Sequence, residues 1–341
     1  MSIIDTCSLR LQDAENTVAA GRSLAQTLYV RPLTILLSGE LGSGKTTFMQ
    51  GLAHGLGIRE PVTSPTYALE QRYRTDGWGE LLHLDLYRLH TPQARELLQS
   101  TEGFEGIRCI EWPEKLETDL NAAFPERIEI SLHEDGAGRR ADIRFTDAAL
   151  PSSARMEEWR TEVRLPPNIV RHCHAVAEVC GTVADALLSR GTVVRKQALL
   201  AAGKTHDLLR FIDFHDGASP PGITHTPEEE AIWDRWRNRY PNRSHEDAAA
   251  AFLRERGFGT LADIVVVHGL HLPPPERPRT EQRLLFYADK RVVMDRVVSL
   301  EERFADFRER YGRGKSSPRS VAWFKEAKAL ERELFPDGPP L

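Results

Sequence analysis

Hydrophobic residues follow a β-type pattern in the first half of the chain. Short apolar runs at residues 33–37, 81–84 and 107–110, and an alternating run at residues 127–132, predict strands, whereas residues 47–56 have the periodicity of a helix. Strands that alternate with helices are typical of a sheet covered by helices on its faces. We therefore expect an α/β fold with a mostly parallel sheet flanked by helices.

The second half is predicted to be almost wholly helical. Its apolar residues recur with helical spacing at residues 170–188, 197–209, 245–255 and 284–298. Residues 213–242 are expected to form a loop with one short helix, and residues 273–278 a rigid proline-containing spacer. These patterns predict an all-α bundle.

The change of pattern also predicts how the chain divides. A length of 341 residues is enough for two domains. We expect an α/β domain over residues 1–150, a polar linker over residues 151–166, a helical domain over residues 167–300 and a charged helical tail over residues 301–341.

Composition narrows the setting in which the protein works. The net charge of -5 gives no overall basic field for bulk nucleic-acid binding. The four cysteines have no paired spacing, so neither a disulfide framework nor a zinc knuckle is indicated. We find no signal-peptide pattern and no apolar run of the roughly 20 residues that a membrane helix needs. We therefore expect a cytoplasmic protein without a membrane partner.

The strongest motif follows the first predicted strand. Residues 39–46 read GELGSGKT, which matches GxxxxGK[ST] between a strand and a helix. Backbone amides of such a loop converge on phosphate oxygens, aided by the positive end of the helix. Lys45 would contact the outer phosphates and the Thr46 hydroxyl would ligate magnesium. The candidate nucleotide-binding residues here are Gly39, Glu40, Leu41, Gly42, Ser43, Gly44, Lys45, Thr46 and Thr47.

Two carboxylates end predicted strands downstream of this loop. Asp85 follows the apolar run at residues 81–84, and Glu111 follows residues 107–110. A magnesium P-loop site needs an acidic partner at the end of a neighbouring strand. Asp85 and Glu111 are therefore candidates for holding the metal and positioning water, although each could instead be a surface charge or a helix cap.

Four motifs together resemble the TsaE family. They are GELGSGKTTF (residues 39–48), VTSPTYAL (62–69), HLDLYRL (83–89) and IEWPEKL (110–116), and the resemblance covers about residues 10–140. It implies an ATPase that uses ATP and Mg²⁺ and supports threonylcarbamoyladenosine formation on tRNA. It also implies TsaB- and TsaD-like partners, with tRNA contacted only indirectly.

The same resemblance implies roles for individual residues. Asp85 takes the Walker-B-like position, and Ser64 and Thr66 lie in a switch-like loop. Glu111 and Trp112 lie beside the nucleotide. Conservative departures are Glu40 and Tyr67, where the family has Asp and Phe. A small-molecule kinase is the alternative, but the sequence offers no obvious lid or base for a substrate hydroxyl.

Potential metal ligands recur on apolar faces in the second half. A single inward histidine is usually a satisfied core residue, whereas several with two aspartates must be paired or coordinated. Imidazole with carboxylate suits a divalent transition metal such as Mn, Fe, Ni or Zn. The candidate ligands are His172, His206, Asp207, His245, His268 and Asp289.

Three of the segments that carry these ligands resemble the HD-domain phosphohydrolase superfamily. They are RHCHAVAEVC (residues 171–180), THDLLR (205–210) and YADKRV (287–292), and the cover is about residues 165–300. The resemblance implies one metal on His172, His206, Asp207 and Asp289. His245 and His268 resemble the additional histidines of binuclear members, in which Asp207 would be the bridging, catalytic carboxylate.

The residues around the His-Asp doublet bear on the activity that this resemblance implies. Lys204 and Thr205 stand where many members of the superfamily have apolar residues, and Lys204, Arg210 and Lys290 are candidates for binding phosphate. Two interpretations stay open for the helical domain. It is either a metal-dependent phosphohydrolase acting on a nucleotide-type substrate or a non-catalytic regulatory module on the ATPase.

Overall fold

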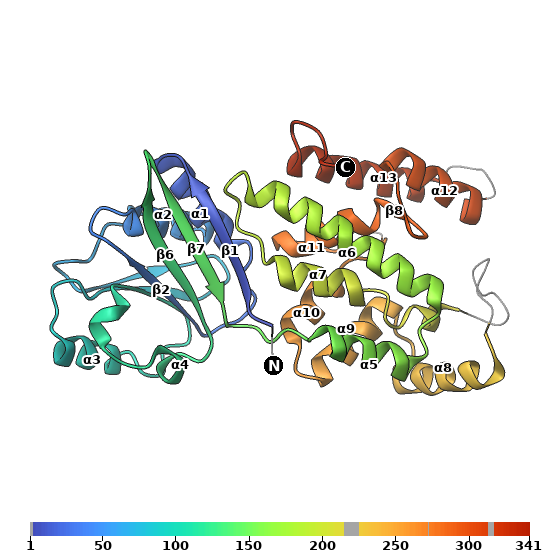
Figure 1. Cartoon of the computed structure of the whole chain (residues 1–341), viewed down its shortest axis with the longest axis horizontal. Coiled ribbons are helices and arrows are strands. Elements are labelled where there is room, and N and C mark those ends of the chain that lie inside the picture. Colours follow the sequence, from blue (N-terminus) through green and yellow to red (C-terminus); the bar gives the residue numbers. More distant parts are fainter. Residues whose placement is uncertain (1–2, 215–224, 272, 313–316) are drawn as a thin grey trace. The chain divides into compact units, whose positions relative to one another are not determined.

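The chain divides into two compact units in the computed structural model, which describes residues 3–214, 225–271, 273–312 and 317–341 (Figure 1). The α/β unit comprises Ile4–Ala148 and Leu187–Arg195. The helical unit comprises Met1–Ile3, Ala149–Ala186 and Lys196–Leu341. A short segment that follows the helix α6 therefore belongs to the α/β unit.

The α/β unit is built on a seven-stranded sheet in the order β1-β7-β6-β2-β5-β4-β3. Its central strands β6, β2, β5 and β4 are parallel, and β1, β7 and β3 pair antiparallel at the edges. The expected α/β fold with a mostly parallel sheet is confirmed. The strands are β1 (Asp5–Leu11), β2 (Leu33–Gly39), β3 (Glu70–Arg74), β4 (Glu80–Asp85), β5 (Ile107–Glu111), β6 (Arg127–Asp135) and β7 (Gly138–Phe145).

Helices cover both faces of this sheet. The apolar side chains of β2 alternate between the faces, so that Ile35 packs with α1 (Ala14–Ala25) and α2 (Lys45–Gly55), and Leu36 packs with the opposite helices. Gly51 lets α1 and α2 approach closely because it has no side chain. A Cβ there would lie 2.1 Å from the carbonyl oxygen of Val18. The other face carries α3 (Thr91–Gln99), η1 (Pro113–Leu116) and α4 (Leu120–Ala123).

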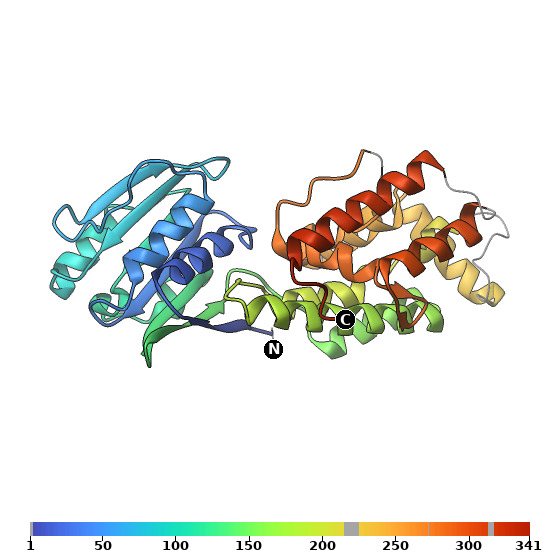
Figure 2. The ribbon, with the colours of Figure 1, turned by 90° about the horizontal axis from the view of Figure 1, so that it is seen from above.

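The helical unit places α7 at its centre. The helix α7 contacts α10 and α11, α9 packs on α10, and α13 contacts both α11 and α12. The red helices α12 and α13 lie side by side in Figure 2. The elements are α5 (Ser153–Val163), α6 (Pro167–Leu188), α7 (Lys196–Thr205), η2 (Arg210–Asp213), α8 (Pro227–Arg239), α9 (His245–Glu255), α10 (Gly259–Val265), α11 (Thr280–Asp289), α12 (Leu300–Gly312) and α13 (Pro318–Leu334), with a small hairpin of β8 (Val292–Val293) and β9 (Arg296–Val297).

The segment expected to be a linker, residues 151–166, is largely folded. Its helix α5 begins after Ser152, whose side chain accepts a hydrogen bond from the amide of Arg155. Met156, Trp159 and Val163 are buried on one face. These positions have helical spacing, but the charged residues between them hide the apolar stripe in the sequence. The linker prediction is therefore wrong for this segment.

Two further elements differ from the sequence predictions. The helix expected over residues 284–298 ends at Asp289, and the β8–β9 hairpin follows, turning at Met294 with a positive φ of 58°. Its valines favour strands over helices. Residues 227–239 form a full helix, α8, with a capping box at Thr226. The glycine-proline stretch of the expected loop falls on residues 215–224, outside the described residues.

The helical tail expected over residues 301–341 is also part of the packed unit. It comprises α12 and α13, and Ala327 and Leu334 on α13 are buried. These helices contribute side chains to the pocket described below.

The segment Leu187–Arg195 completes the α/β core. Val193 is fully buried in that core, and its amide donates to Ser23 Oγ over 2.9 Å. The guanidinium of Arg195 donates twice to the Asp147 carboxylate, over 2.7 and 2.8 Å, and once to the Thr27 carbonyl over 2.7 Å. The expected boundary near residue 150 overlooks this return of the chain, because no local pattern marks it.

Asp147→Ala is expected to destabilise the α/β unit by about 3–5 kcal/mol, since it leaves the Arg195 charge buried and unpaired. Urea unfolding monitored by far-UV circular dichroism measures the change. The matched control is Asp185→Ala, because Lys196 Nζ also makes two short contacts with Asp185, at 2.6 and 2.8 Å, but Asp185 is 61% exposed. That control should cost less than about 1 kcal/mol. Equal losses would contradict a structural role for this buried pair.

Candidate functional sites

The phosphate-binding motif lies between the central strand β2 and the helix α2. Gly39, Gly42 and Gly44 have φ angles of 141°, 83° and 99°, in the region that disfavours side chains. A Cβ at Gly39 would also lie 2.4 Å from the Leu132 carbonyl oxygen. The glycines therefore permit a tight loop whose amides and helix start can face an anion.

Lys45 reaches back over this loop. Its ammonium donates to the carbonyl oxygens of Gly39 and Glu40, over 2.8 and 2.9 Å, and lies 3.9 Å from the centroid of the Trp112 ring. Burial lowers the pKa of Lys45, and the charge of Glu111 opposes this shift. The cation is thus held beside the loop, in contact with carbonyl oxygens that phosphate oxygens could replace.

The two strand-terminal carboxylates lie side by side, because Asp85 and Glu111 are direct partners in the β4–β5 register. The Thr46 hydroxyl donates to Glu111 Oε1 over 3.2 Å. The hydroxyls of Ser64 and Thr66 both donate to Asp85 Oδ2, over 2.9 and 2.5 Å. Sequence-predicted residues from four segments therefore meet at the carboxyl end of the sheet.

Other residues at this edge were not predicted. His83 is buried with its Nε2 3.0 Å from Glu111 Oε1, and it stands in the HLDLYRL motif that pointed only to Asp85. Arg139, on the distant strand β7, donates to the Gly42 carbonyl over 3.4 Å. Nothing in the sequence around Arg139 marks it. Leu41, one of the predicted nucleotide-binding residues, is 72% exposed to solvent.

The predicted metal ligands of the helical unit also come together. His172 lies on α6, His206 and Asp207 directly follow α7, His245 begins α9, His268 lies beyond α10, and Asp289 ends α11. The Oδ1 atom of Asp289 is 3.1 Å from His172 Nε2 and 3.8 Å from His206 Nε2. One end of the cluster is therefore formed by His172, His206 and Asp289.

Asp207 lies at the centre of this cluster. Its Oδ1 is 3.1 Å from His245 Nε2 and 3.6 Å from His268 Nε2, and its Oδ2 is 3.7 Å from His206 Nε2 and 4.0 Å from His172 Nε2. Burial would raise the pKa of Asp207, but the surrounding histidines outweigh it and hold that pKa well below its usual range. A carboxylate that faces four imidazoles from its two oxygens has the geometry of a bridging ligand.

Three of the histidine rings are held in place by hydrogen bonds from Nδ1 to backbone carbonyls. Backbone carbonyls of Met294, Gly203 and Val265 accept from Nδ1 of His172, His206 and His268, over 2.8, 2.9 and 2.6 Å respectively. Such contacts fix the proton on Nδ1 and leave Nε2 as the ligating atom.

His206 carries the clearest indication of a cation. Its buried Nε2 has no hydrogen-bond partner among the described residues. Burial lowers the pKa of His206 to about 4, so the ring is neutral at pH 7. With the proton on Nδ1, the Nε2 lone pair faces the carboxylates of Asp207 and Asp289. A metal ion between these atoms would give the Nε2 lone pair a partner and offset the charge of the two carboxylates. The residues present therefore fit a bound metal ion.

The other end of the cluster contains residues that the sequence did not single out. His245 Nδ1 contacts Asp213 Oδ2 over 2.6 Å and Glu246 Oε2 over 3.1 Å. Burial would lower the pKa of His245, but Asp207 and Asp213 raise it to about 9. His245, Glu246 and His268 form a further group whose atoms could share one ion. Acidic residues flanking a helix start are too common to have been noticed in the sequence.

A pocket of about 620 Å³ opens over this cluster and is lined by all the predicted ligands except His206. Two of the three phosphate-clamp candidates line it. The guanidinium Nη1 of Arg210 lies 3.3 Å from Asp213 Oδ2. Lys290 is buried, and its ammonium contacts the Asp289 carboxylate. Lys204 is not among the lining residues.

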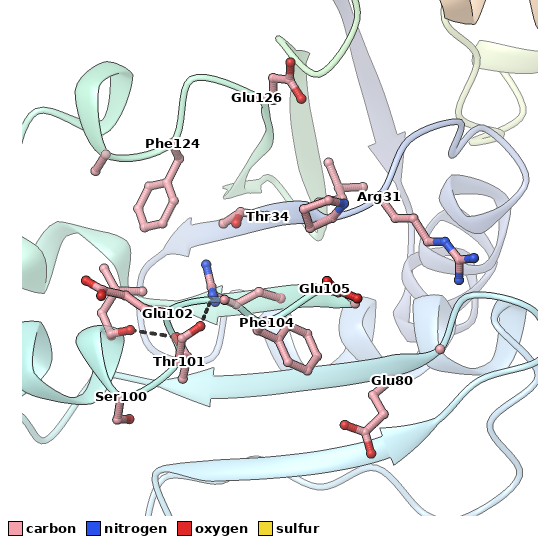
Figure 3. A pocket seen from close by; sticks show the side chains of 18 of the residues that line it. Arg31, Thr34, Glu80, Ser100, Thr101, Glu102, Phe104, Glu105, Phe124 and Glu126 are labelled. Atoms are coloured by element: carbon pink, nitrogen blue, oxygen red, sulfur yellow. Dashed lines mark hydrogen bonds between the residues drawn. The ribbon is translucent and has the colours of Figure 1, made fainter.

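A second hollow, of about 1420 Å³, lies in the α/β unit at the amino ends of β2, β4 and β5 (Figure 3). Arg31, Thr34 and Glu80 are among the residues around it. It is at the opposite end of these strands from Gly39, Asp85 and Glu111, and it contains none of the predicted site residues.

The sheet topology and the loop define the α/β unit as a P-loop nucleotide-binding domain. A GxxxxGKT loop joins a central parallel strand to a helix, and acidic residues end the neighbouring strands. The family model described as "Threonylcarbamoyl adenosine biosynthesis protein TsaE" matches residues 11–141. The chain belongs to the TsaE family.

Curated relatives support this assignment. The TsaE protein of Nostoc is 44% identical over 121 residues, which cover 34% of this chain and 74% of the relative. The Bacillus subtilis protein is 35% identical over 138 residues, which cover 40% of this chain and 83% of the relative.

The crystal structure of Bacillus subtilis YdiB matches with 28% identity and a TM-score of 0.34, covering 43% of this chain and 89% of that one. Across the described residues, no helix has the length and apolar character to span a bilayer.

Proposed function

We propose that the α/β unit binds and hydrolyses ATP with Mg²⁺ and thereby supports threonylcarbamoyladenosine formation on tRNA. The observation that carries this proposal is the meeting of the P-loop, Thr46 and the carboxylates of Asp85 and Glu111 at one edge of the sheet. Relatives that share this region are named for this biosynthesis. TsaB- and TsaD-like proteins are the proposed partners, with tRNA contacted through them.

Each residue has a distinct task in this proposal. Lys45, which now donates to loop carbonyls, would donate to the outer phosphates of a bound nucleotide. The Thr46 hydroxyl and the Asp85 carboxylate would hold Mg²⁺, which would supply positive charge beside the phosphates. Glu111, supported by His83, accepts a hydrogen bond from the attacking water. Ser64 and Thr66 tie the loop before β3 to Asp85, the carboxylate that would hold the ion.

Complementation tests the tRNA role. The full chain, expressed in a bacterium depleted of its own TsaE, should restore threonylcarbamoyladenosine in tRNA, measured by mass spectrometry of digested nucleosides. Thr46→Val keeps the side-chain shape but removes the magnesium ligand and should fail to restore it. Thr6→Val makes the same change at an exposed position of β1 and should restore it fully. Restoration by Thr46→Val would refute a role for this ATP site.

We also propose that the helical unit is an HD-type metal-dependent phosphohydrolase acting on a nucleotide-type substrate. The unpartnered Nε2 of His206, surrounded by carboxylates, is the main support. His172, His206, Asp207 and Asp289 would hold one ion, and His245 and His268 with Asp207 a second. Such ions polarise water and phosphate oxygens. In the reaction, a water oxygen bonds to phosphorus, the ester P–O bond breaks, and the released alcohol oxygen takes a proton.

The chain's own groups position the phosphate in this proposal. Lys290 is buried against Asp289 and lies beside the pocket floor, where its ammonium can turn toward an incoming anion. Arg210 enters the same pocket from the segment that follows Asp207. Asp213 holds the imidazole of His245 in place through its Nδ1 contact.

Metal analysis of the purified protein, with an assay on a panel of phosphoesters, tests this second activity. One or two transition metals per chain together with phosphomonoester hydrolysis would support it. Absence of both, with ATP binding intact, would favour the alternative that the helical unit is a non-catalytic regulatory module.

A further inference from the structure

We propose that α12 and α13 supply a subsite for a planar aromatic ring, so that the substrate class of the helical unit is a nucleoside monophosphate. This inference rests on the proposed metal site, which would hold the phosphate at the floor of the same pocket. The aromatic residues of this subsite, Phe307 and Trp323, lie beyond residues 165–300, the range that resembles the HD superfamily. Their chemistry favours a ring over a sugar alone.

The charges of the pocket favour an anionic ligand. Its lining contains four carboxylates, and four cationic side chains balance them. Every divalent ion bound at the floor adds two positive charges to this balance, so the loaded pocket attracts an anion. The carboxylates are Asp207, Asp213, Glu246 and Asp289, and the cations are Arg210, Lys290, Arg303 and Arg319.

Two aromatic side chains from the last two helices line the pocket. Phe307 lies on α12 and Trp323 on α13. The Trp323 indole donates to the His271 carbonyl over 2.9 Å, which fixes the plane of its ring. Trp323 is half-buried, whereas the buried residues of α13 are Ala327, Glu331 and Leu334. Trp323 therefore contributes to a pocket wall rather than to the core.

Each aromatic ring is paired with an arginine. The guanidinium carbon of Arg319 lies 4.9 Å from the Trp323 ring centroid, and that of Arg303 lies 4.6 Å from the Phe307 centroid. Nucleobases stack on aromatic rings and on guanidinium planes regardless of sequence. Arg303 also has a buried Nε atom with no partner among the described residues. The wall thus offers flat apolar surfaces edged by positive charge.

The size of the pocket restricts the ligand further. A volume of about 620 Å³ lies within the range of roughly 300–1,000 Å³ typical of small-molecule sites. It suits a mononucleotide whose phosphate lies at the metal floor and whose base reaches Trp323. A sugar phosphate would leave the aromatic wall without a partner.

Binding of unreactive analogues tests this subsite separately from hydrolysis. The probes are the 5′-phosphonates of adenosine and of ribose, in which a methylene group replaces the ester oxygen. Calorimetry uses the full chain loaded with Mn²⁺ and carrying Lys45→Ala, so that the P-loop does not compete. The adenosine analogue should bind at least about tenfold more tightly than the ribose analogue, the effect of stacking one base.

Two variants remove the wall in different ways. Trp323→Leu and Arg319→Gln should each lower the preference for the adenosine analogue, by about tenfold and about threefold, while ribose phosphonate affinity stays unchanged. Arg319 is exposed, so its replacement does not threaten the fold. Val321→Ala is the matched control, since Val321 is an exposed residue of α13 outside the pocket lining.

The outcomes separate this proposal from the proposed activity. Equal affinity for the two analogues, or equal losses for both in Trp323→Leu, would overturn the subsite. A preference lost in the wall variants establishes the subsite even if natural phosphomonoesters are not hydrolysed, in which case only the hydrolase assignment fails.

Discussion

Lys45→Ala is expected to weaken ATP binding by at least about 100-fold. Hydrogen bonds to charged groups contribute about 1.5–3 kcal/mol each, and Lys45 can make two of them to phosphate. The side chain already makes two such bonds to loop carbonyls, so its reach and orientation suit the task. Calorimetric titration with ATP and Mg²⁺ measures the change.

The transition-metal content of the same variant should stay at the wild-type value, because Lys45 and the proposed metal ligands belong to different units. Lys325→Ala is the control, since it removes the same charge from an exposed position of α13 and should leave both properties intact. If Lys45→Ala lost metal as well as ATP, the model of two separate sites would be wrong.

The second large effect is expected for Asp207→Ala, which should empty the proposed transition-metal site and lower the proposed phosphomonoester hydrolysis by at least about 1,000-fold. The two oxygens of Asp207 face four histidines, so no other single side chain touches as much of the cluster. Losing a ligand shared by two ions removes charge from both positions. Elemental analysis and a phosphate-release assay report the two effects.

Asp234→Ala provides the comparison for this change. Asp234 is 59% exposed on α8 and pairs only with Arg237 in the described structure, so its loss should leave metal and hydrolysis unchanged. Phosphate release that survives in Asp207→Ala would show that the His-Asp doublet does not carry the activity. Calorimetric ATP binding should be preserved in both variants, which verifies that the α/β unit is folded.

The residues of the proposed nucleotide site could be singled out in the sequence because they lie at the ends of strands. The apolar runs before Gly39, Asp85 and Glu111 are local signals, and parallel pairing then brings the three ends to one edge. His83 and Arg139 reach the same edge through register and through a distant strand. Such contacts are set by the tertiary fold, and no neighbouring residue announces them.

In the helical cluster, too, some residues are marked by the local sequence and others are placed only by the tertiary fold. Residues such as His172 and Asp289 stood out because ionisable groups on apolar faces demand a partner. Asp213 and Glu246 complete the surroundings of His245 but follow no unusual pattern. Trp323 is brought to the same pocket by the tertiary fold, and no local periodicity in the sequence marks it.

The segment Leu187–Arg195 has a consequence for the order in which the chain folds during synthesis. The strand β7 ends at Phe145, so 50 more residues must be made before Arg195 can reach Asp147. At about 5–20 residues per second, the sheet waits roughly 3–10 s for its last core residue. The nascent α/β unit therefore stays incomplete on the ribosome until all of α6 has been made, and its folding is tied to the synthesis of the first part of the helical unit.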